Sequence, residues 1–356
     1  MIEFQYAQQL YQELERFKKA GHSAEETESF FRQNKPNYFP KRTSLIAVIS
    51  QKGGNGKSTF ATNFSLGLGN LGIYKVGLLD LDILDPNDKK LLSTELEYMV
   101  DGIGCLTSIL TKELTGSKYG ITEEEKKEIL KKGQVADFLY GRMATTKDPK
   151  IYTLFSDIPS RLDKKKDEVY QEIFSLFTRA SAYKSKMDFL VCDFGSGSMS
   201  DPNIAELMRY FDYRLMVVVP NEVGIEGIKT AIDNDINEEY QRQTAENVLI
   251  LNRVKSEMME QFTKKLSEQI PTLKGKGTNE AEAFLNEVRT DLSSVLKLDH
   301  GAIIFYDKKM DQDLFTRKIL KPAILNGRPI DYCREVDKVI NFTINSTIKK
   351  RVGGTK

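Results

Sequence analysis

Residues 51–59 have the sequence Gln-Lys-Gly-Gly-Asn-Gly-Lys-Ser-Thr, and this stretch decides how the rest of the chain is interpreted. An apolar run at 45–49 (Leu-Ile-Ala-Val-Ile) precedes it, and a segment of helical character begins near Ser58. A strand, a glycine-rich turn and a Lys-Ser pair that opens a helix place backbone N–H groups around the phosphates of a nucleotide. The usual pattern requires a glycine where this chain has Gln51, and Lys52 is an additional lysine. The sequence therefore predicts a variant phosphate-binding loop.

The residue types in this loop each have a chemical reason. Lys57 is placed to reach the β- and γ-phosphates, and Ser58 is placed to offer its hydroxyl to Mg²⁺. Glycines allow the backbone to approach the phosphates without a side-chain clash, and they stand at Gly53, Gly54 and Gly56. We therefore expect this loop to bind a nucleotide together with Mg²⁺.

Carboxylates follow two further apolar runs of strand length. Asp80 and Asp82 come after the run 76–79, and Asp193 comes after the run 189–192. Open α/β sheets bind their ligands at the carboxyl ends of the strands. A carboxylate there can support a Mg²⁺ shell or orient a water molecule. Together with the loop, these aspartates predict one site made of three segments.

The alternation of short apolar runs with helical segments predicts an α/β fold. We expect a doubly wound, mainly parallel sheet of the P-loop NTPase type, with helices on both faces. This nucleotide-binding domain is expected over 44–356, with helical insertions near 101–149 and 256–298. Strands are expected at 45–50, 75–80, 151–156, 188–193, 214–219, 248–252 and 302–306, and helices near 58–69, 167–183, 202–210, 223–238, 256–270, 281–297 and 331–350.

Residues 1–43 predict a short N-terminal helical extension. An apolar stripe at three- and four-residue spacings from Phe4 to Phe17 is typical of an amphipathic helix, and a second helix is expected from Glu25 to Phe31. Packing on the core is the simpler interpretation, and a partner-recruiting arm is the alternative. We expect a cytoplasmic protein, since the N-terminus has no signal-peptide pattern and no apolar run approaches membrane-helix length.

The loop and the aspartates together resemble a known family. Lys52-Gly-Gly-x-Gly-Lys-Ser-Thr59, followed by Asp80-x-Asp82 and then Asp193, is similar to the deviant Walker A ATPases of the ParA/MinD family, which are SIMIBI-class P-loop NTPases. The resemblance extends over about residues 44–350, including the stretch Leu249-Ile-Leu-Asn252. It departs from the family at Asn55, which replaces a small apolar residue, and after Asp193, where the chain has Phe-Gly-Ser-Gly instead of x-Pro-Pro-Gly.

The resemblance implies an ATPase that forms a homodimer around ATP and Mg²⁺ and responds to an activating partner protein. Lys52 would cross the interface to the partner's phosphates, which would make activity depend on dimerisation. The other roles that the resemblance implies are phosphate and Mg²⁺ binding by Lys57 and Ser58, the α-phosphate side for Thr59, orientation of the attacking water by Asp82, support of the Mg²⁺ shell by Asp80 and Asp193, an adenine contact by Asn252, and loop backbone contacts at Gly53, Gly54, Asn55 and Gly56.

Features outside the site bear on which branch of the family the chain joins. Its three cysteines, Cys105, Cys192 and Cys333, are far apart and form no CxxC pair, which argues against iron–sulfur carriers. A stripe at Ile344, Ile348 and Val352 continues the last helix, so packing is favoured over membrane insertion.

Residues 305–356 hold twelve Lys or Arg against six Asp or Glu, although the whole chain has a net charge of only +1. This leaves nonspecific DNA binding open, through Lys308, Lys309, Arg317, Lys318 and Lys321. We expect an enzyme that positions or partitions DNA or another large cargo. The alternative is a MinD-like regulatory or assembly scaffold, acting in membrane, division-site or flagellar placement, in which slow hydrolysis is a timer.

Overall fold

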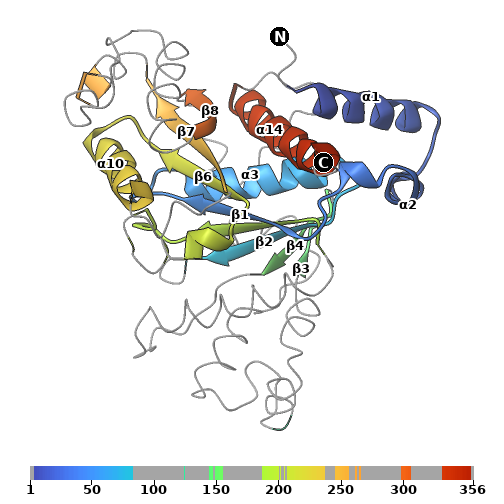
Figure 1. The fold of residues 1–356 in the computed structure, drawn as a ribbon, viewed down its shortest axis with the longest axis horizontal. Coiled ribbons are helices and arrows are strands. Elements are labelled where there is room, and N and C mark those ends of the chain that lie inside the picture. Colours follow the sequence, from blue (N-terminus) through green and yellow to red (C-terminus); the bar gives the residue numbers. More distant parts are fainter. Residues whose placement is uncertain are drawn as a thin grey trace.

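A computed structural model of the chain describes residues 4–82, 124, 144–146, 149–154, 187–199, 201, 204, 207–236, 245–255, 261, 262, 264, 265, 298–305 and 331–353. Within these residues the architecture is a central sheet with helices on both faces (Figure 1). None of the helices in this part of the chain combines the length and the apolar character needed to cross a membrane.

The sheet has eight strands in the order β3-β4-β2-β5-β1-β6-β7-β8. All neighbours are parallel except β3 and β4 at one edge, which pair antiparallel. The strands are β1 (Ser44–Ile49), β2 (Val76–Leu81), β3 (Ala144–Thr145), β4 (Tyr152–Leu154), β5 (Phe189–Phe194), β6 (Tyr213–Val218), β7 (Glu246–Val254) and β8 (Leu298–Phe305). The predicted doubly wound, mainly parallel sheet is therefore confirmed, and β3 is the strand that the sequence did not indicate.

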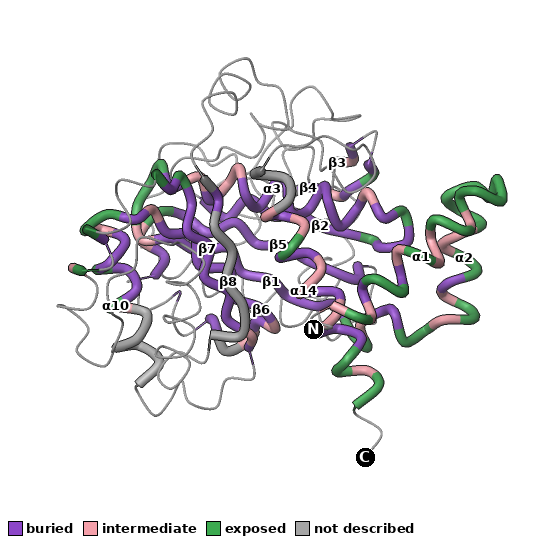
Figure 2. Tube along the Cα trace, turned by 90° about the horizontal axis from the view of Figure 1, so that it is seen from above, coloured by how far each residue is buried: buried purple, intermediate pink, exposed green. Residues whose placement is uncertain are grey.

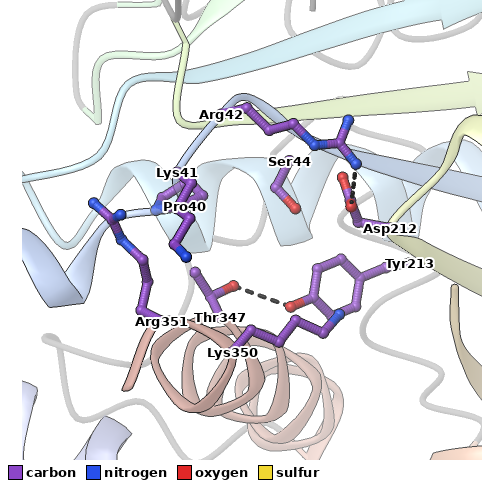
Figure 3. Close-up of a pocket in the computed structure, with 9 residues that line it drawn as sticks. All are labelled: Pro40, Lys41, Arg42, Ser44, Asp212, Tyr213, Thr347, Lys350 and Arg351. Carbon is purple, nitrogen blue, oxygen red and sulfur yellow. Dashed lines mark hydrogen bonds and ion pairs between the residues drawn. The ribbon is translucent and has the colours of Figure 1, made fainter. Parts of the chain in front are cut away.

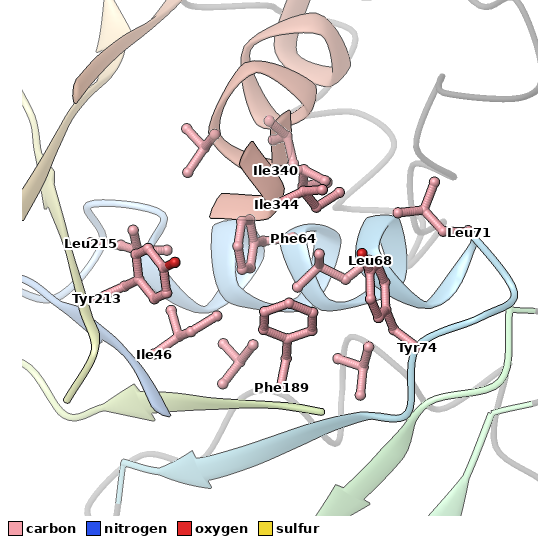
Figure 4. Close-up of a cluster of buried hydrophobic side chains, with 14 of the residues drawn as sticks. Ile46, Phe64, Leu68, Leu71, Tyr74, Phe189, Tyr213, Leu215, Ile340 and Ile344 are labelled. Atoms are coloured by element: carbon pink, nitrogen blue, oxygen red, sulfur yellow. The ribbon is translucent and has the colours of Figure 1, made fainter. Parts of the chain in front are cut away.

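The helix that follows the phosphate-binding loop, α3 (Lys57–Gly69), lies between the sheet and the last helix, α14 (Asp331–Gly353). Figure 4 shows Phe64 and Leu68 of α3 between Phe189 of the sheet and Ile344 of α14. Eleven of the thirteen residues of α3 are buried, because the helix is covered from both sides. This packing fixes the amino end of α3 against the carboxyl ends of the central strands.

The two N-terminal helices, α1 (Gln5–Lys19) and α2 (Ala24–Asn34), pack at one end of the sheet, with their outer residues exposed (Figure 2). Tyr6 donates its backbone N–H to Asn345 Oδ1 of α14 at 3.0 Å, and the Tyr11 hydroxyl donates to Asn341 Oδ1 at 2.6 Å. Ser23 caps α2 by a reciprocal pair of hydrogen bonds with Glu26. The apolar stripe of the first helix is therefore used for packing on the core, while the predicted division into domains stays a prediction.

Several other predicted elements can be compared with the structure. The helix predicted at 223–238 is α10 (Glu222–Ile236), and the one predicted at 331–350 is α14. From the predicted helix at 202–210, the structure describes the short 3-10 helix η2 (Met208–Tyr210); a second one, η1 (Pro36–Tyr38), precedes β1. The helices predicted at 167–183, 256–270 and 281–297 and the insertion at 101–149 lie largely or wholly outside the described residues.

Candidate functional site

The phosphate-binding loop connects the end of β1 to the start of α3, and two of its glycines have a left-handed backbone. Gly54 and Gly56 both have φ of +81°, a conformation that L side chains rarely adopt. At Gly56 space is also limiting, because an added Cβ would lie 2.3 Å from Asn252 Nδ2. At Gly54 an added Cβ would meet nothing within 4 Å, so the backbone conformation alone requires glycine there.

Lys57 and Asp193 form a buried ion pair at the carboxyl edge of the sheet. Lys57 Nζ lies 2.6 Å from Asp193 Oδ1, and the two side chains are 6% and 1% exposed. Burial raises the pKa of Asp193, and hydrogen bonding and charge from Lys57, followed by a hydrogen bond from Ser58, oppose this. The other oxygen, Asp193 Oδ2, is buried and has no hydrogen-bond partner among the residues that the structure describes. The loop lysine thus rests on a carboxylate that still has an acceptor to offer.

The remaining two aspartates lie beside this pair. The register of β2 against β5 places Asp80 next to Asp193, and Asp80 is fully buried. Asp82 follows β2, is also buried, and donates its backbone N–H to Asp80 Oδ1 at 3.1 Å. The structure therefore brings Asp80, Asp82 and Asp193 to the same edge as Lys57, as the sequence predicted from strand ends.

A hydroxyl in the segment after β5 connects that segment to the loop. Ser198 is buried, and its Oγ accepts a hydrogen bond from the Ser50 backbone N–H at 3.0 Å and donates to the Ser50 carbonyl at 3.1 Å. Sequence reasoning noted that the segment after Asp193 is rich in glycine and serine but did not single out Ser198. Spacing alone could not show which of these hydroxyls faces the start of the loop.

Asn252 lies near the end of β7 and holds the loop from the other side. Its Nδ2 donates to the carbonyl of Asn55 at 2.7 Å, and its Oδ1 accepts from the backbone N–H of Arg253 at 2.9 Å. The backbone of Arg253 is in the left-handed region, with φ of 56°. Both polar ends of the Asn252 amide are thus used within the chain, and its adenine contact stays a prediction.

The other predicted residues are placed around the mouth of the loop. Lys52 is exposed, whereas Ser58 and Thr59 are half-buried in the first turn of α3. The predicted DNA contacts, Lys308, Lys309, Arg317, Lys318 and Lys321, lie outside the described residues.

The donor set fits a Mg²⁺ ion that is bound together with phosphate. In the described part of the chain, no group of three or more His, Cys, Asp or Glu side chains could hold a metal ion alone. Mg²⁺ in phosphoryl-transfer sites is held by one or two protein oxygens, with phosphate oxygens and water completing the shell. The free Oδ2 of Asp193 and the Ser58 hydroxyl are oxygens of this kind.

Comparison with known protein families identifies the class of this site. A family model described as "ParA: NUBPL iron-transfer P-loop NTPase" matches residues 41–159, which include the whole phosphate-binding loop and Asp80. The predicted recognition, a resemblance to ParA-type P-loop NTPases, is therefore confirmed for this part of the chain.

Two curated relatives and one solved structure add to this match. The iron-sulfur cluster carrier protein of Pyrococcus abyssi is 52% identical over 52 residues, covering 15% of this chain and 17% of that protein. The cytosolic Fe-S cluster assembly factor NUBP2 homolog of Dictyostelium discoideum is 30% identical over 192 residues, covering 52% of this chain and 60% of that protein. The MinC:MinD cell division protein complex of Aquifex aeolicus matches with a TM-score of 0.50 and 17% identity, covering 88% of this chain and 97% of that one.

These comparisons differ in what they support. The structural match shows the fold alone, because the sequence identity is low. The chain spans from about a sixth to three fifths of the length of the two curated relatives. Both relatives are named for iron–sulfur clusters, a branch that the lack of a cysteine pair argued against.

Proposed function

We propose that this chain, which carries a ParA-type P-loop NTPase domain, hydrolyses ATP to ADP and phosphate in an active site shared by two copies. The observation that carries the proposal is the buried ion pair of Lys57 and Asp193, which lies beside a loop whose glycines have positive φ. A buried lysine that contacts a carboxylate can exchange that carboxylate for a phosphate oxygen and still face a negative charge. This gives the chain two states, with and without nucleotide.

The chain's own residues divide the work of such a cycle. Lys57 neutralises phosphate charge, the loop backbone N–H groups hold the phosphates, and Asp82 orients the attacking water. Asp193 and Asp80 would hold the water shell of Mg²⁺, which would neutralise part of the phosphate charge when it is bound. Because Ser198 bonds to Ser50 at the start of the loop, a shift of the loop would be transmitted to the segment after Asp193.

Lys52 is proposed to act across a homodimer. It is exposed beside the loop, and the described residues include no carboxylate that pairs with it. A shared site predicts that ATPase activity per molecule rises with protein concentration and that Lys52→Ala lowers it at every concentration. Lys229→Ala, which removes an exposed lysine from α10, is the matched control. A constant specific activity with an unaffected Lys52→Ala variant would contradict the shared site.

The cargo that we propose is DNA or another large cytoplasmic body, positioned with the help of an activating partner. The local excess of basic residues at 305–356 supports this. A MinD-like scaffold with slow hydrolysis remains the alternative. Co-sedimentation with DNA at low salt, with and without ATP and beside anionic vesicles, separates the two. If the ATP-bound protein retains no DNA, the DNA-positioning form of the proposal is wrong.

Iron–sulfur cluster transfer is a second candidate, and the names of the curated relatives favour it. Cys192 does not support it, because this thiol is buried within β5, and burial and then Asp193 raise its pKa. A cluster would therefore have to be held by Cys105 and Cys333 of two copies, which together supply four thiolates. Anaerobic reconstitution with iron and sulfide, followed by visible absorption and iron analysis, tests this. Iron that stays bound in wild type and is lost in Cys105→Ser and Cys333→Ser would favour transfer.

A further inference from the structure

A basic pocket of about 140 Å³ lies at the amino ends of the central strands, whereas the phosphate-binding loop lies at their carboxyl ends. Its floor is formed by Ser44, the first residue of β1, and Tyr213, the first residue of β6. Because the phosphate-binding loop follows the other end of β1, the strand's six residues separate the two sites by roughly 20 Å. The pocket is therefore distinct from the nucleotide site.

Two segments of the chain bring positive charge to this pocket (Figure 3). Lys41 and Arg42 come from the segment before β1, and Lys350 and Arg351 come from the end of α14. Arg42 pairs with Asp212 at 2.9 Å, and Lys350 pairs with Glu246 at 2.8 Å. Among the described residues, four cationic groups thus face two carboxylates, which leaves two positive charges in excess.

The two cations without a carboxylate differ in their surroundings. Arg351 donates to the backbone carbonyls of Phe39 and Pro36, which fixes its guanidinium but does not neutralise it. Lys41 is exposed and has no acidic partner in the ranges that the structure describes. An anion that entered the pocket would therefore meet one positioned guanidinium and one adjustable ammonium group.

A neutral donor also faces the pocket. Ser44 is 6% exposed, and its hydroxyl makes no hydrogen bond to any described residue. Figure 3 shows this hydroxyl directed into the pocket, opposite Thr347 of α14. The Tyr213 hydroxyl is by contrast already used, bonding to the Thr343 carbonyl and to Thr347 Oγ1. The Ser44 hydroxyl is therefore available to a ligand that enters the pocket.

We propose that this pocket is a second anion site, which binds the phosphate group of a small ligand. The excess of two positive charges matches a phosphate dianion, and Ser44 supplies a donor to a phosphate oxygen. The volume is well below the roughly 300 Å³ of the smallest typical ligand pockets, so the pocket can enclose a phosphate group but not a whole nucleotide. The ligand is therefore inorganic phosphate or the phosphate head of a small monoester.

Calorimetric titration of the full chain tests this proposal. The phosphate-binding loop is first saturated with Mg²⁺ and a nonhydrolysable ATP analogue, so that it cannot bind the added anion. Inorganic phosphate and glycerol 3-phosphate are then titrated separately at low ionic strength. Binding of phosphate alone or of both ligands identifies a site open to free phosphate, and binding of the monoester alone identifies a monoester site. A protein that binds neither overturns the proposal.

Matched variants locate the binding. Lys41→Gln is expected to weaken it about fivefold to tenfold, as loss of a charge-assisted contact does, and Ser44→Ala about threefold. Lys349→Gln is the control: it removes the same charge from an exposed residue of α14 that precedes Lys350 and does not line the pocket. It should change phosphate binding less than about twofold. Equal weakening by Lys41→Gln and Lys349→Gln would show only general attraction to a basic surface and would overturn the site.

Discussion

Strand β5 has an aspartate paired with a cation near each of its ends, and the two pairs differ in how completely they are satisfied. Asp188 precedes the strand and binds Arg32 of α2, with Nη2 to Oδ2 at 2.6 Å. Asp193 lies near the other end and binds Lys57 of α3, with Nζ to Oδ1 also at 2.6 Å. The contact distance is the same, so any difference in role must come from the surroundings.

The Asp188 pair is saturated. Arg32 contacts both carboxylate oxygens, and it also bonds to Glu28 and the Ile73 carbonyl. Asp188 Oδ2 accepts a further bond from the Lys75 backbone N–H at 2.8 Å. A forked guanidinium with this many partners has one favourable position. This pair therefore holds the N-terminal helices to the sheet and is not suited to exchange partners.

The Asp193 pair is unsaturated. Within the described ranges Asp193 Oδ2 is buried without a hydrogen-bond partner, and Lys57 carries a compact ammonium group on a flexible stem. Unused acceptor capacity in a buried site is costly unless a ligand completes it. From this contrast we infer that a carboxylate with both oxygens bonded stabilises the fold. A carboxylate with an unused oxygen at the carboxyl ends of the strands can bind a ligand.

The largest expected effect comes from removing the unsaturated pair. Lys57→Ala should abolish measurable ATP binding and lower ATPase activity by more than about 100-fold, because phosphate charge is no longer neutralised. Fluorescence titration with a labelled nucleotide and phosphate-release kinetics measure the two effects. Asp82→Ala is the informative companion, because it should keep ATP binding and trap the ATP-bound dimer. Normal hydrolysis by Asp82→Ala would contradict its assigned role.

Breaking the saturated pair should have a smaller and purely structural effect. Arg32→Ala leaves Asp188, whose side chain is only 8% exposed, without its cation, and should lower the free energy of unfolding by about 2 kcal/mol. Urea denaturation measures this change. The ATPase rate of the folded fraction should stay unchanged.

Arg16→Ala provides the control for Arg32→Ala, since it removes an exposed arginine from α1. It should change the unfolding free energy by less than about 0.5 kcal/mol. If fully folded Arg32→Ala protein had a lower ATPase rate, the pair at one end of β5 would affect the site at the other end, contrary to what their contacts indicate.

The hydroxyl of Ser198 tests whether the unsaturated end acts as a unit. Ser198→Ala removes both bonds to Ser50 and should cost about 1–2 kcal/mol of stability, since a buried N–H loses its acceptor. The segment after Asp193 should also lose protection against hydrogen exchange when nucleotide is bound. Ser196→Ala, at an exposed position of the same segment, should change neither quantity.

The sequence predicted the regular parts of this fold because they depend on local pattern. The near-continuous apolar run of β6 and the glycine loop before Lys57 each specify their structure within about ten residues. Asp80 and Asp193 could be placed at one edge because the ends of parallel strands coincide. By contrast, β3 is only two residues long and its pairing with β4 is nonlocal, so no periodicity indicates it.

The contacts that distinguish this site could not be predicted for the same reason. The bonds from Asn252 to Asn55 and from Ser198 to Ser50 join residues that are 197 and 148 positions apart. Residue type showed that these side chains were polar, but only the folded chain shows which atom each one reaches. The Arg32–Asp188 pair, at a separation of 156 residues, was hidden in the same way.

The smallest expected effect concerns Asp337 of α14, a carboxylate that pairs with no cation in the described part of the chain. Its Oδ1 is buried and has no hydrogen-bond partner among the described residues, and burial raises its pKa to about 7. Since the folded pKa lies above the unfolded value of about 3.9, the folded chain binds a proton more tightly. The stabilisation is therefore complete below pH 4 and is lost as the pH rises through 7.

Asp337→Asn should remove this loss, because the neutral amide resembles the protonated acid. After the discount for partial exposure, we expect the variant to gain about 1 kcal/mol over wild type at pH 8 and nothing at pH 4. Urea denaturation at both pH values measures the difference. If the stability difference between the variant and wild type were the same at pH 4 and pH 8, Asp337 would not be the buried, unpartnered acid that the structure shows. The free-energy cost of burying Asp337 should therefore appear only as a pH dependence of stability. The cost of burying Asp193 should instead be relieved when nucleotide binds.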